Sequence, residues 1–139
     1  AAKKIRAFGV EDNARITRYD AWWLDEVFAA GELSGIYLNH PDPWPKEKHQ
    51  RNRLLCPFFA EWAARTLKPG SEMRLKTDSL LNLRQLEAAI KDQPFEIVAQ
   101  VEDIGRNGVP WPEDEEITTN FQRKFQNMGL PVHGMVLRR

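Results

Sequence analysis

Residues 35–53 read GIYLNHPDPWPKEKHQRNR, and this stretch decides the interpretation of the whole chain. The apolar run at its start, residues 35–38, predicts a buried strand that ends where three prolines begin. Each proline fixes φ, removes an N–H group and disfavours helix at the residue before it, so the loop is stiff. In open α/β sheets, ligands bind beyond the carboxyl ends of the strands. Asp42 and Trp44 are therefore candidates for a functional site.

Strand and helix patterns alternate on both sides of this loop. Strands are predicted over residues 14–19, 34–39, 72–76, 95–101 and 132–137, and helices over residues 1–8, 21–30, 80–91 and 119–128. The segment 53–67 predicts a further helix, which begins near Pro57 or bends there. Residues 105–116, rich in glycine, proline and acids, are expected to form a mobile loop. Alternation of this kind is typical of an α/β sheet, with Trp22, Trp23, Phe58, Phe59 and Trp62 in its core.

Length and composition limit the class of protein. The chain has 139 residues, of which 42% are hydrophobic, and we expect a single domain over residues 1–139 with its own core. We expect no membrane-spanning or secretory segment. A single cysteine, Cys56, excludes an internal disulfide and suits a reducing cytoplasm. The formal net charge is zero, so any basic surface for nucleic acid must be local.

Four segments, in this order along the chain, resemble the bacterial tRNA (guanine-N7)-methyltransferases. Asn13 with residues 19–21 is similar to the family's N-V…D-A segment, and residues 41–53 resemble its PDPWPKKRHxKRR signature. Residues 67–78 resemble LKPGGxxxxxTD, and residues 119–132 resemble TxYExKF…GxPI. The signature at 41–53 is highly specific to this family, and the match extends from about residue 1 to residue 136.

The resemblance implies a Rossmann-like class I methyltransferase. The expected fold is α/β, with helices on both faces of the sheet and an antiparallel last strand. S-adenosylmethionine is the implied methyl donor, and a guanine in the variable loop of tRNA is the implied substrate. The runner-up is a non-catalytic tRNA-binding module, or a subunit that needs a partner to supply the donor site.

One part of the family's pattern is missing from the sequence. Such enzymes open with a strand and a glycine-rich turn for the donor, followed by a second strand. No G-x-G segment precedes Asp20, so the chain resembles roughly the carboxyl-terminal two-thirds of the enzyme, without the N-terminal strands. In the family's strand order, the missing strands lie between the predicted strands 14–19 and 34–39. We therefore expect unpaired strand edges, closed by a homodimer or by a strand-sharing partner.

Guanine N7 dictates what chemistry the site must provide. Its lone pair lies outside the aromatic sextet, so it can attack a methyl group without a general base. Catalysis then consists of positioning the base and stabilising the cationic purine that forms. A carboxylate does both, so Asp42 is the predicted catalytic residue, in contact with substrate and cofactor. The alternative is an aspartate that only forms the turn between two prolines.

The resemblance assigns further residues to the site. Asp20 corresponds to an acid near the cofactor adenine, although an N-cap of the following helix competes with that role. The residues assigned to the substrate are Lys46, Asp78, Thr119 and Gln122. N-capping competes at Asp78 as well. Gln122 stands where the family has glutamate, and His40 where it has phenylalanine.

The basic run after the prolines predicts an RNA contact. Lys46, Lys48, Arg51 and Arg53 against Glu47 are four cations and one anion, a local balance of +3. With His49, they are expected to contact the RNA backbone. The alternative is a solvated helix start, which the macrodipole disfavours for cations.

Three other features of the sequence bear on the site. Trp44 either stacks on an extruded guanine or packs beneath the loop. The acidic run at 113–116 should repel phosphate. The spacing of His40, Asp42, His49 and Cys56 fits no zinc pattern, so no metal is predicted.

Overall fold

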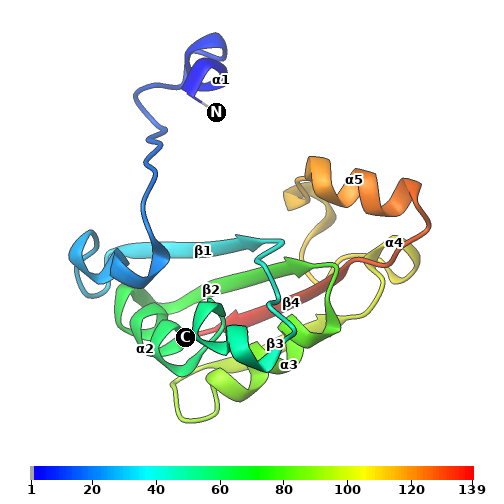
Figure 1. Ribbon diagram of the computed structural model, residues 1–139. Helices are drawn as coiled ribbons and strands as arrows, with labels where there is room; N and C mark the ends of the chain where they lie inside the picture. Colours follow the sequence, from blue (N-terminus) through cyan, green and yellow to red (C-terminus); the bar gives the residue numbers. More distant parts are fainter. Residues whose placement is uncertain (1) are drawn as a thin grey trace.

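The computed structural model describes residues 2–139, except the side chains of residues 2, 22, 24 and 25. The described residues form a mixed four-stranded sheet in the order β1-β2-β4-β3 (Figure 1). Its strands are β1 (Leu33–Asn39), β2 (Leu67–Thr77), β3 (Glu96–Val101) and β4 (His133–Arg138). β1 runs parallel to β2, whereas β4 runs antiparallel to both β2 and β3. The predicted α/β sheet with an antiparallel last strand is confirmed.

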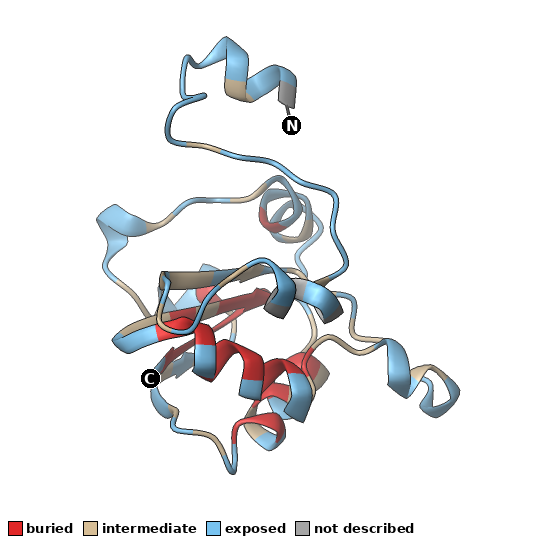
Figure 2. Cartoon of the chain, turned by 90° about the vertical axis from the view of Figure 1, so that its left-hand side faces the viewer, coloured by how far each residue is buried: buried red, intermediate tan, exposed pale blue. Residues whose placement is uncertain are grey.

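The core lies between the sheet and two helices, α2 (Pro57–Thr66) and α3 (Leu80–Ala89) (Figures 1 and 2). Alternate residues of β2 and β4, among them Met73, Leu75 and Met135, enter one continuous apolar cluster with both helices. Pro57 stands in the first turn of α2, where a missing N–H costs nothing, so the helix begins there as predicted. Phe59 and Trp62 are in this core, but Phe58 is exposed.

The opposite face of the sheet is polar and is covered by residues 108–119 and by α5 (Asn120–Asn127). Two short segments, α4 (Ile104–Asn107) and η3 (Glu113–Glu115), overlap the loop predicted over residues 105–116, which is therefore partly helical. Gly134 allows this covering segment to approach. A Cβ there would lie 2.9 Å from the Pro110 ring, too close for any side chain.

The N-terminal prediction was partly wrong. The helix α1 (Ala2–Ala7) forms as expected, with Ala1 outside the described residues, and stands apart from the sheet (Figure 1). Residues 14–20 are extended but pair with no strand of the described sheet, so the predicted strand 14–19 is absent. An alternating pattern becomes a strand only when a neighbour accepts its hydrogen bonds.

The predicted helix 21–30 is also shorter than expected. A 3-10 helix, η1 (Ala21–Glu26), kinks at Trp23, and Gly31 follows with a φ of +65°. Trp23 is 58% exposed rather than in the core, and the side chain of Trp22 lies outside the described residues. β2 begins at Leu67 rather than at Glu72, directly after α2. The bounds predicted for the other helices and strands agree with the structure to within one or two residues.

Candidate active site

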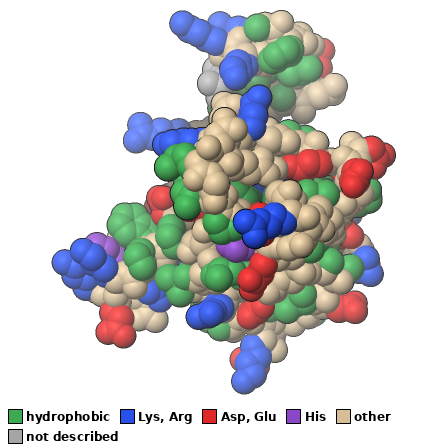
Figure 3. Space-filling view, turned by 90° about the vertical axis from the view of Figure 1, so that its right-hand side faces the viewer, with side chains coloured by type: hydrophobic (Ala, Val, Ile, Leu, Met, Phe, Trp, Pro, Cys, Tyr) green, Lys and Arg blue, Asp and Glu red, His purple; other side chains and the backbone are tan. Residues whose placement is uncertain are grey.

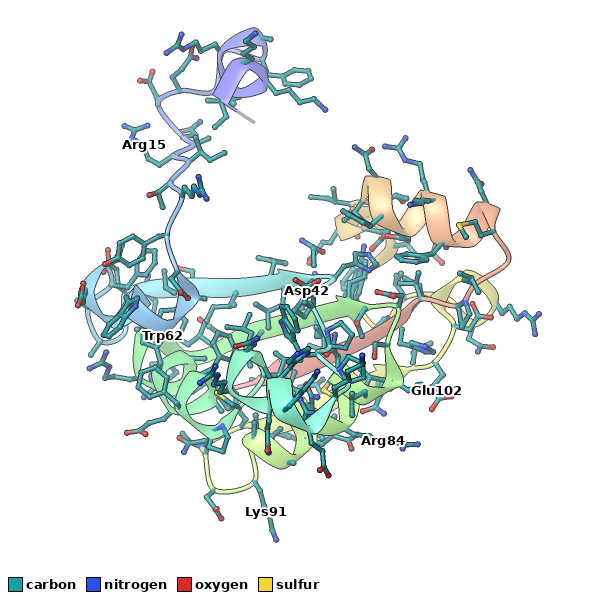
Figure 4. The ribbon with its side chains drawn as sticks, viewed as in Figure 1. Arg15, Asp42, Trp62, Arg84, Lys91 and Glu102 are labelled. Carbon is teal, nitrogen blue, oxygen red and sulfur yellow. The ribbon has the colours of Figure 1, made fainter. Side chains whose placement is uncertain are left out.

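The Asp42 loop has a strained backbone on both sides of its carboxylate. His40 has a φ of +50° and Trp44 a φ of +41°, in the left-handed region that residues other than glycine seldom adopt. Such conformations persist where the surrounding structure holds them in place, and they concentrate at functional sites. Asp42 lies between these two residues and is exposed (Figure 4).

Helix α3 holds the first half of this loop through its carbonyl groups. Asn82 donates from Nδ2 to the Pro41 carbonyl at 2.7 Å, and Gln85 donates from Nε2 to the Pro43 carbonyl at 3.3 Å. Because prolines have no N–H group, the carbonyls are the backbone groups through which this segment can be held. Both carbonyls that flank Asp42 are therefore fixed by one helix.

Arg53 holds the second half of the loop. Its guanidinium donates to the Trp44 carbonyl at 3.0 Å and to the Pro45 carbonyl at 3.3 Å. The Trp44 ring is half-buried and meets the His49 ring edge-on, with 5.4 Å between centroids. Two members of the predicted RNA-binding run thus support the loop itself.

Asp42 and Asp20 line the same pocket. Its other lining residues are Ala21, Pro41, Trp44, Asn52 and Leu54. The structure therefore brings together the two carboxylates assigned to the cofactor, although they lie on segments more than twenty residues apart. Their contact with a cofactor stays a prediction.

A second group of predicted residues meets at His40, which follows β1. His40 Nδ1 lies 3.3 Å from Asp78 Oδ1, and Nε2 lies 3.3 Å from Thr119 Oγ1. The side chain of His40 is 6% exposed and packs against the rings of Phe121 and Phe125. Sequence reasoning placed Asp78 and Thr119 at the site but gave no role to His40. The signal that could have found it was a polar ring where the family has phenylalanine.

Gln122 faces inward, toward a buried lysine. Lys76 donates from Nζ to Gln122 Oε1 at 2.9 Å, to Glu116 Oε1 at 2.7 Å and to the Ile117 carbonyl at 3.0 Å. Trp111 donates from Nε1 to the other oxygen of Glu116 at 2.8 Å. Lys76 and Gln122 are 5% and 4% exposed. This network fastens the covering segment and α5 to the polar face of the sheet.

The charges of this network balance. Burial alone would raise the pKa of Glu116, but hydrogen bonds from Lys76, Gln122 and Trp111, with the charge of Lys76, outweigh burial and lower that pKa. With glutamine at position 122, one lysine faces one carboxylate. Glutamine, which stands here in place of the family's glutamate, therefore leaves the group of Lys76, Glu116 and Gln122 without net charge.

Arg74 pairs with a second acid of the same run. Its guanidinium lies 2.6 Å from Glu115 and 2.9 Å from Glu72, within 6 Å of the ring centroids of Tyr37 and Trp111. Burial alone would lower the pKa of Arg74, but the two carboxylates outweigh burial and raise it. Glu115 and Glu116, predicted to repel phosphate, thus neutralise cations of the sheet. They line a pocket that also contains Thr119.

The predicted RNA-binding run forms its own 3-10 helix, η2 (Glu47–Asn52), separated from α2 by residues 53–56. The cations are therefore not at the N-terminus of α2, and the helix-dipole argument does not apply. Lys46, Lys48 and Arg51 are exposed, while His49 and Arg53 are half-buried. Figure 3 shows basic side chains spread over the visible face and interspersed with acids rather than gathered in one patch. RNA contact by this run stays a prediction.

The described residues contain neither a metal-binding cluster nor a membrane-spanning helix. No group of three or more His, Cys, Asp or Glu is placed to hold a metal ion there. Within residues 2–139, no helix is long and apolar enough to cross a membrane.

Comparison with known proteins identifies the family of this chain. A family model described as "Putative methyltransferase" matches residues 1–135. A protein of Bdellovibrio bacteriovorus named tRNA (guanine-N(7)-)-methyltransferase is 33% identical over 87% of this chain and 56% of its own length. One of the same name from Ruegeria pomeroyi is 36% identical over 98% of this chain and 55% of its own length. The chain thus spans about half the length of these curated relatives.

Solved structures support the fold. TrmN from Thermus thermophilus has a TM-score of 0.62 at 20% identity, covering 99% of this chain and 31% of that one. Geranyl diphosphate C-methyltransferase from Streptomyces coelicolor A3(2) has a TM-score of 0.60 at 14% identity, covering 99% and 59%. At these identities the likeness shows the class I methyltransferase fold alone. By its match to the family model over residues 1–135, the chain belongs to this methyltransferase family, and the curated proteins that it resembles are named tRNA (guanine-N(7)-)-methyltransferases.

Proposed function

We propose that this chain is the substrate-binding part of an enzyme that transfers a methyl group from S-adenosylmethionine to N7 of a guanine in the variable loop of tRNA. The observation that carries this proposal is the Asp42 loop. The loop lies just beyond the carboxyl end of β1 and is held through four of its carbonyl groups. The chain that contains it belongs to a methyltransferase family. A clamp of this kind suits a reaction in which positioning does most of the work.

The chemistry assigned to each residue follows from its position. The exposed Asp42 carboxylate can accept hydrogen bonds from the guanine N1–H and amino groups, and its charge offsets the positive charge that develops on the base. Asp78 and Thr119, joined through His40, offer a second acceptor and a hydroxyl at the same end of the sheet. Lys46 is exposed beside the loop and can meet the phosphate of the target nucleotide.

The described residues fit one side of a donor site. When bound, S-adenosylmethionine supplies an electrophilic methyl group on a sulfonium. Asp20 and Asp42 line a common pocket and would accept hydrogen bonds from the donor's polar groups. No G-x-G turn occurs in residues 2–139, and the outer edge of β1 has no partner strand in the described sheet. We infer that residues outside this segment, or a second subunit, pair with β1 and complete the site.

The proposed tRNA substrate gives a role to the exposed cations of η2. Lys48 and Arg51 would track the tRNA backbone, since phosphate contacts dominate affinity. The proposed location is the cytoplasm, and the proposed partner is tRNA, with a second copy of the chain as the candidate for strand sharing.

A product analysis tests this function. The chain, joined to the part of a curated relative that it does not match, would be incubated with unmodified tRNA and methyl-labelled S-adenosylmethionine. Digestion to nucleosides should yield labelled 7-methylguanosine, and the labelled tRNA should break at that nucleotide after borohydride and aniline treatment. Label in any other nucleoside, or none at all, would contradict the proposal.

A further inference from the structure

His40 joins two groups that come from distant parts of the chain. Asp78 follows β2, whereas Thr119 stands at the N-cap of α5, and the His40 ring lies between their side chains at 3.3 Å from each. Phe121 and Phe125 pack on the ring, with centroids 5.9 Å and 5.8 Å from that of His40. The ring is thus fixed in orientation and has a polar partner on each nitrogen.

The partners determine which way each hydrogen bond points. An ionised carboxylate only accepts, so the Asp78 contact requires a proton on His40 Nδ1. Thr119 Oγ1 already accepts from the N–H of Gln122 at 3.0 Å, which leaves its own hydrogen free to point at His40. A neutral imidazole with a proton on Nδ1 has its lone pair on Nε2, where that hydroxyl can donate.

From this geometry we infer that His40 is a positioning residue, which links Gln122, Thr119 and Asp78 into one directed chain of hydrogen bonds. The backbone N–H of Gln122 donates to Thr119, the Thr119 hydroxyl donates to His40 Nε2, and His40 Nδ1–H donates to Asp78. This chain sets the Asp78 carboxylate and the start of α5 at a fixed separation. Its consequence for methyl transfer rests on the proposed function, but the hydrogen-bond chain itself does not.

The structure provides an internal control in His133. The N–H of Asp103 donates to His133 Nδ1 at 3.3 Å, so the neutral ring of His133 must carry its proton on Nε2. The two buried histidines are therefore expected to be opposite tautomers. Two histidine side chains without such partners would instead show the same mixture of tautomers in one solution.

Nitrogen spectra of the 139-residue chain test the tautomers. Long-range proton–nitrogen correlation would be recorded in alkaline buffer, where imidazoles are neutral, with His40→Phe used to assign the signals. We expect a protonated Nδ1 in His40 and a protonated Nε2 in His133. A proton on Nε2 of His40 would overturn the inference, because Asp78 would then face a lone pair.

Two variants test whether the partners impose this tautomer. Asp78→Ala removes the acceptor, and Thr119→Val removes the hydroxyl with little change in shape. Each should shift the His40 nitrogen signals while leaving those of His133 unchanged, and either variant suffices if the other fails to fold. Unchanged His40 signals in a folded variant would overturn the hydrogen-bond chain.

The positioning role is tested by kinetics on the same enzyme used for the product analysis. His40→Phe keeps a ring against Phe121 and Phe125 but removes the hydrogen bonds to Thr119 and Asp78, so kcat should fall about tenfold while KM for tRNA stays unchanged. His40→Asn places an amide N–H near Asp78 and should recover part of kcat. Equal kcat in all three proteins would refute the positioning role, whereas an inactive wild type with the expected tautomers would refute only the proposed function.

Discussion

Asp42 is held by the residues around it, so its own side chain is free for chemistry. Asn82, Gln85 and Arg53 fasten the loop backbone, and the Asp42 carboxylate remains exposed in the pocket that it shares with Asp20. A residue that served only to form the turn would use its carboxylate on nearby backbone N–H groups. The loop has few such groups, because three of its residues are prolines.

Replacing Asp42 by alanine therefore separates catalysis from structure. In the full-length enzyme, Asp42→Ala should lower turnover roughly a hundredfold, as expected for one group that stabilises the transition state. Affinity for tRNA should change little, because backbone contacts dominate it. Asp92→Ala, at an exposed acid after α3, is the matched control. Single-turnover methylation rates decide the outcome, and a near-normal rate would leave Asp42 as a turn residue.

Lys76 differs from Asp42, because its charged group is buried and donates three hydrogen bonds within the protein. Lys76→Met should lower the free energy of unfolding at pH 7 by about 3 kcal/mol, because Glu116 would keep a half-buried charge without its cation. The pKa of Glu116 is lowered in the folded state, so its contribution to stability is present above about pH 4.5 and is lost as the pH falls through the folded pKa.

The difference between wild type and Lys76→Met should therefore shrink at acidic pH. Urea unfolding at pH 7 and near pH 3 measures it, with Lys91→Met, an exposed lysine, as the control. A difference that is equal at both pH values would show that the Lys76 stem, rather than its charge, stabilises the fold.

At the scale of elements, the basic run around η2 contains two kinds of side chain. Lys46, Lys48 and Arg51 are exposed, and we propose that they contact RNA. Arg53 instead donates to two carbonyls of the Asp42 loop, and His49 packs on Trp44. Loss of Arg53 would therefore disturb the loop and the RNA contact together. Only the exposed cations allow a clean test of RNA binding.

Lys48→Ala combined with Arg51→Ala should weaken tRNA binding and its dependence on salt. If this surface meets about three phosphates, log affinity should fall against log salt with a slope of roughly −2 to −3, and the double variant should flatten it by about one to two. Filter binding over a salt series measures the slope. Arg84→Ala combined with Lys91→Ala removes two exposed cations elsewhere (Figure 4) and should leave it unchanged. An unaltered slope in the first variant would move the RNA site away from η2.

At the scale of the whole molecule, the unpaired edge of β1 and the greater length of the relatives both agree with the proposal that other residues complete the donor site. The described chain contains the clamped loop, the His40 group and the polar face, but the predicted strand 14–19 has no neighbour to pair with. About half the length of the curated relatives is represented here.

The 139-residue chain alone should therefore bind S-adenosylmethionine weakly. Isothermal titration should show no micromolar binding to the chain, whereas a curated relative of full length should bind, since the glycine-rich turn of the family is expected there. Micromolar affinity of the isolated chain would reveal a donor site that the described residues do not show.

Much of the fold could be predicted because its signals are local. Pro57 marks the start of α2, Thr119 caps α5 through its hydroxyl, and the apolar run before Asn39 forms β1. These features depend on φ restriction, capping and side-chain period, which act within a few residues. The family motifs, which are equally local, assigned Asp42, Asp78, Thr119 and Gln122 to the site. The structure places these residues at one end of the sheet.

The sequence by itself thus determined the α/β class and most element bounds, and it indicated which segments form the candidate site. Only the tertiary structure decided that residues 14–19 form no strand, that Arg53 supports the loop, that Gln122 accepts a hydrogen bond from the buried Lys76, and that His40 joins Asp78 to Thr119. The contacts of Gln122 and His40 are hydrogen bonds between segments far apart in the chain, and that of Arg53 spans a loop. Such partners are chosen by how the sheet and helices pack, because a donor or acceptor buried by that packing must be paired with whatever group the fold brings near it.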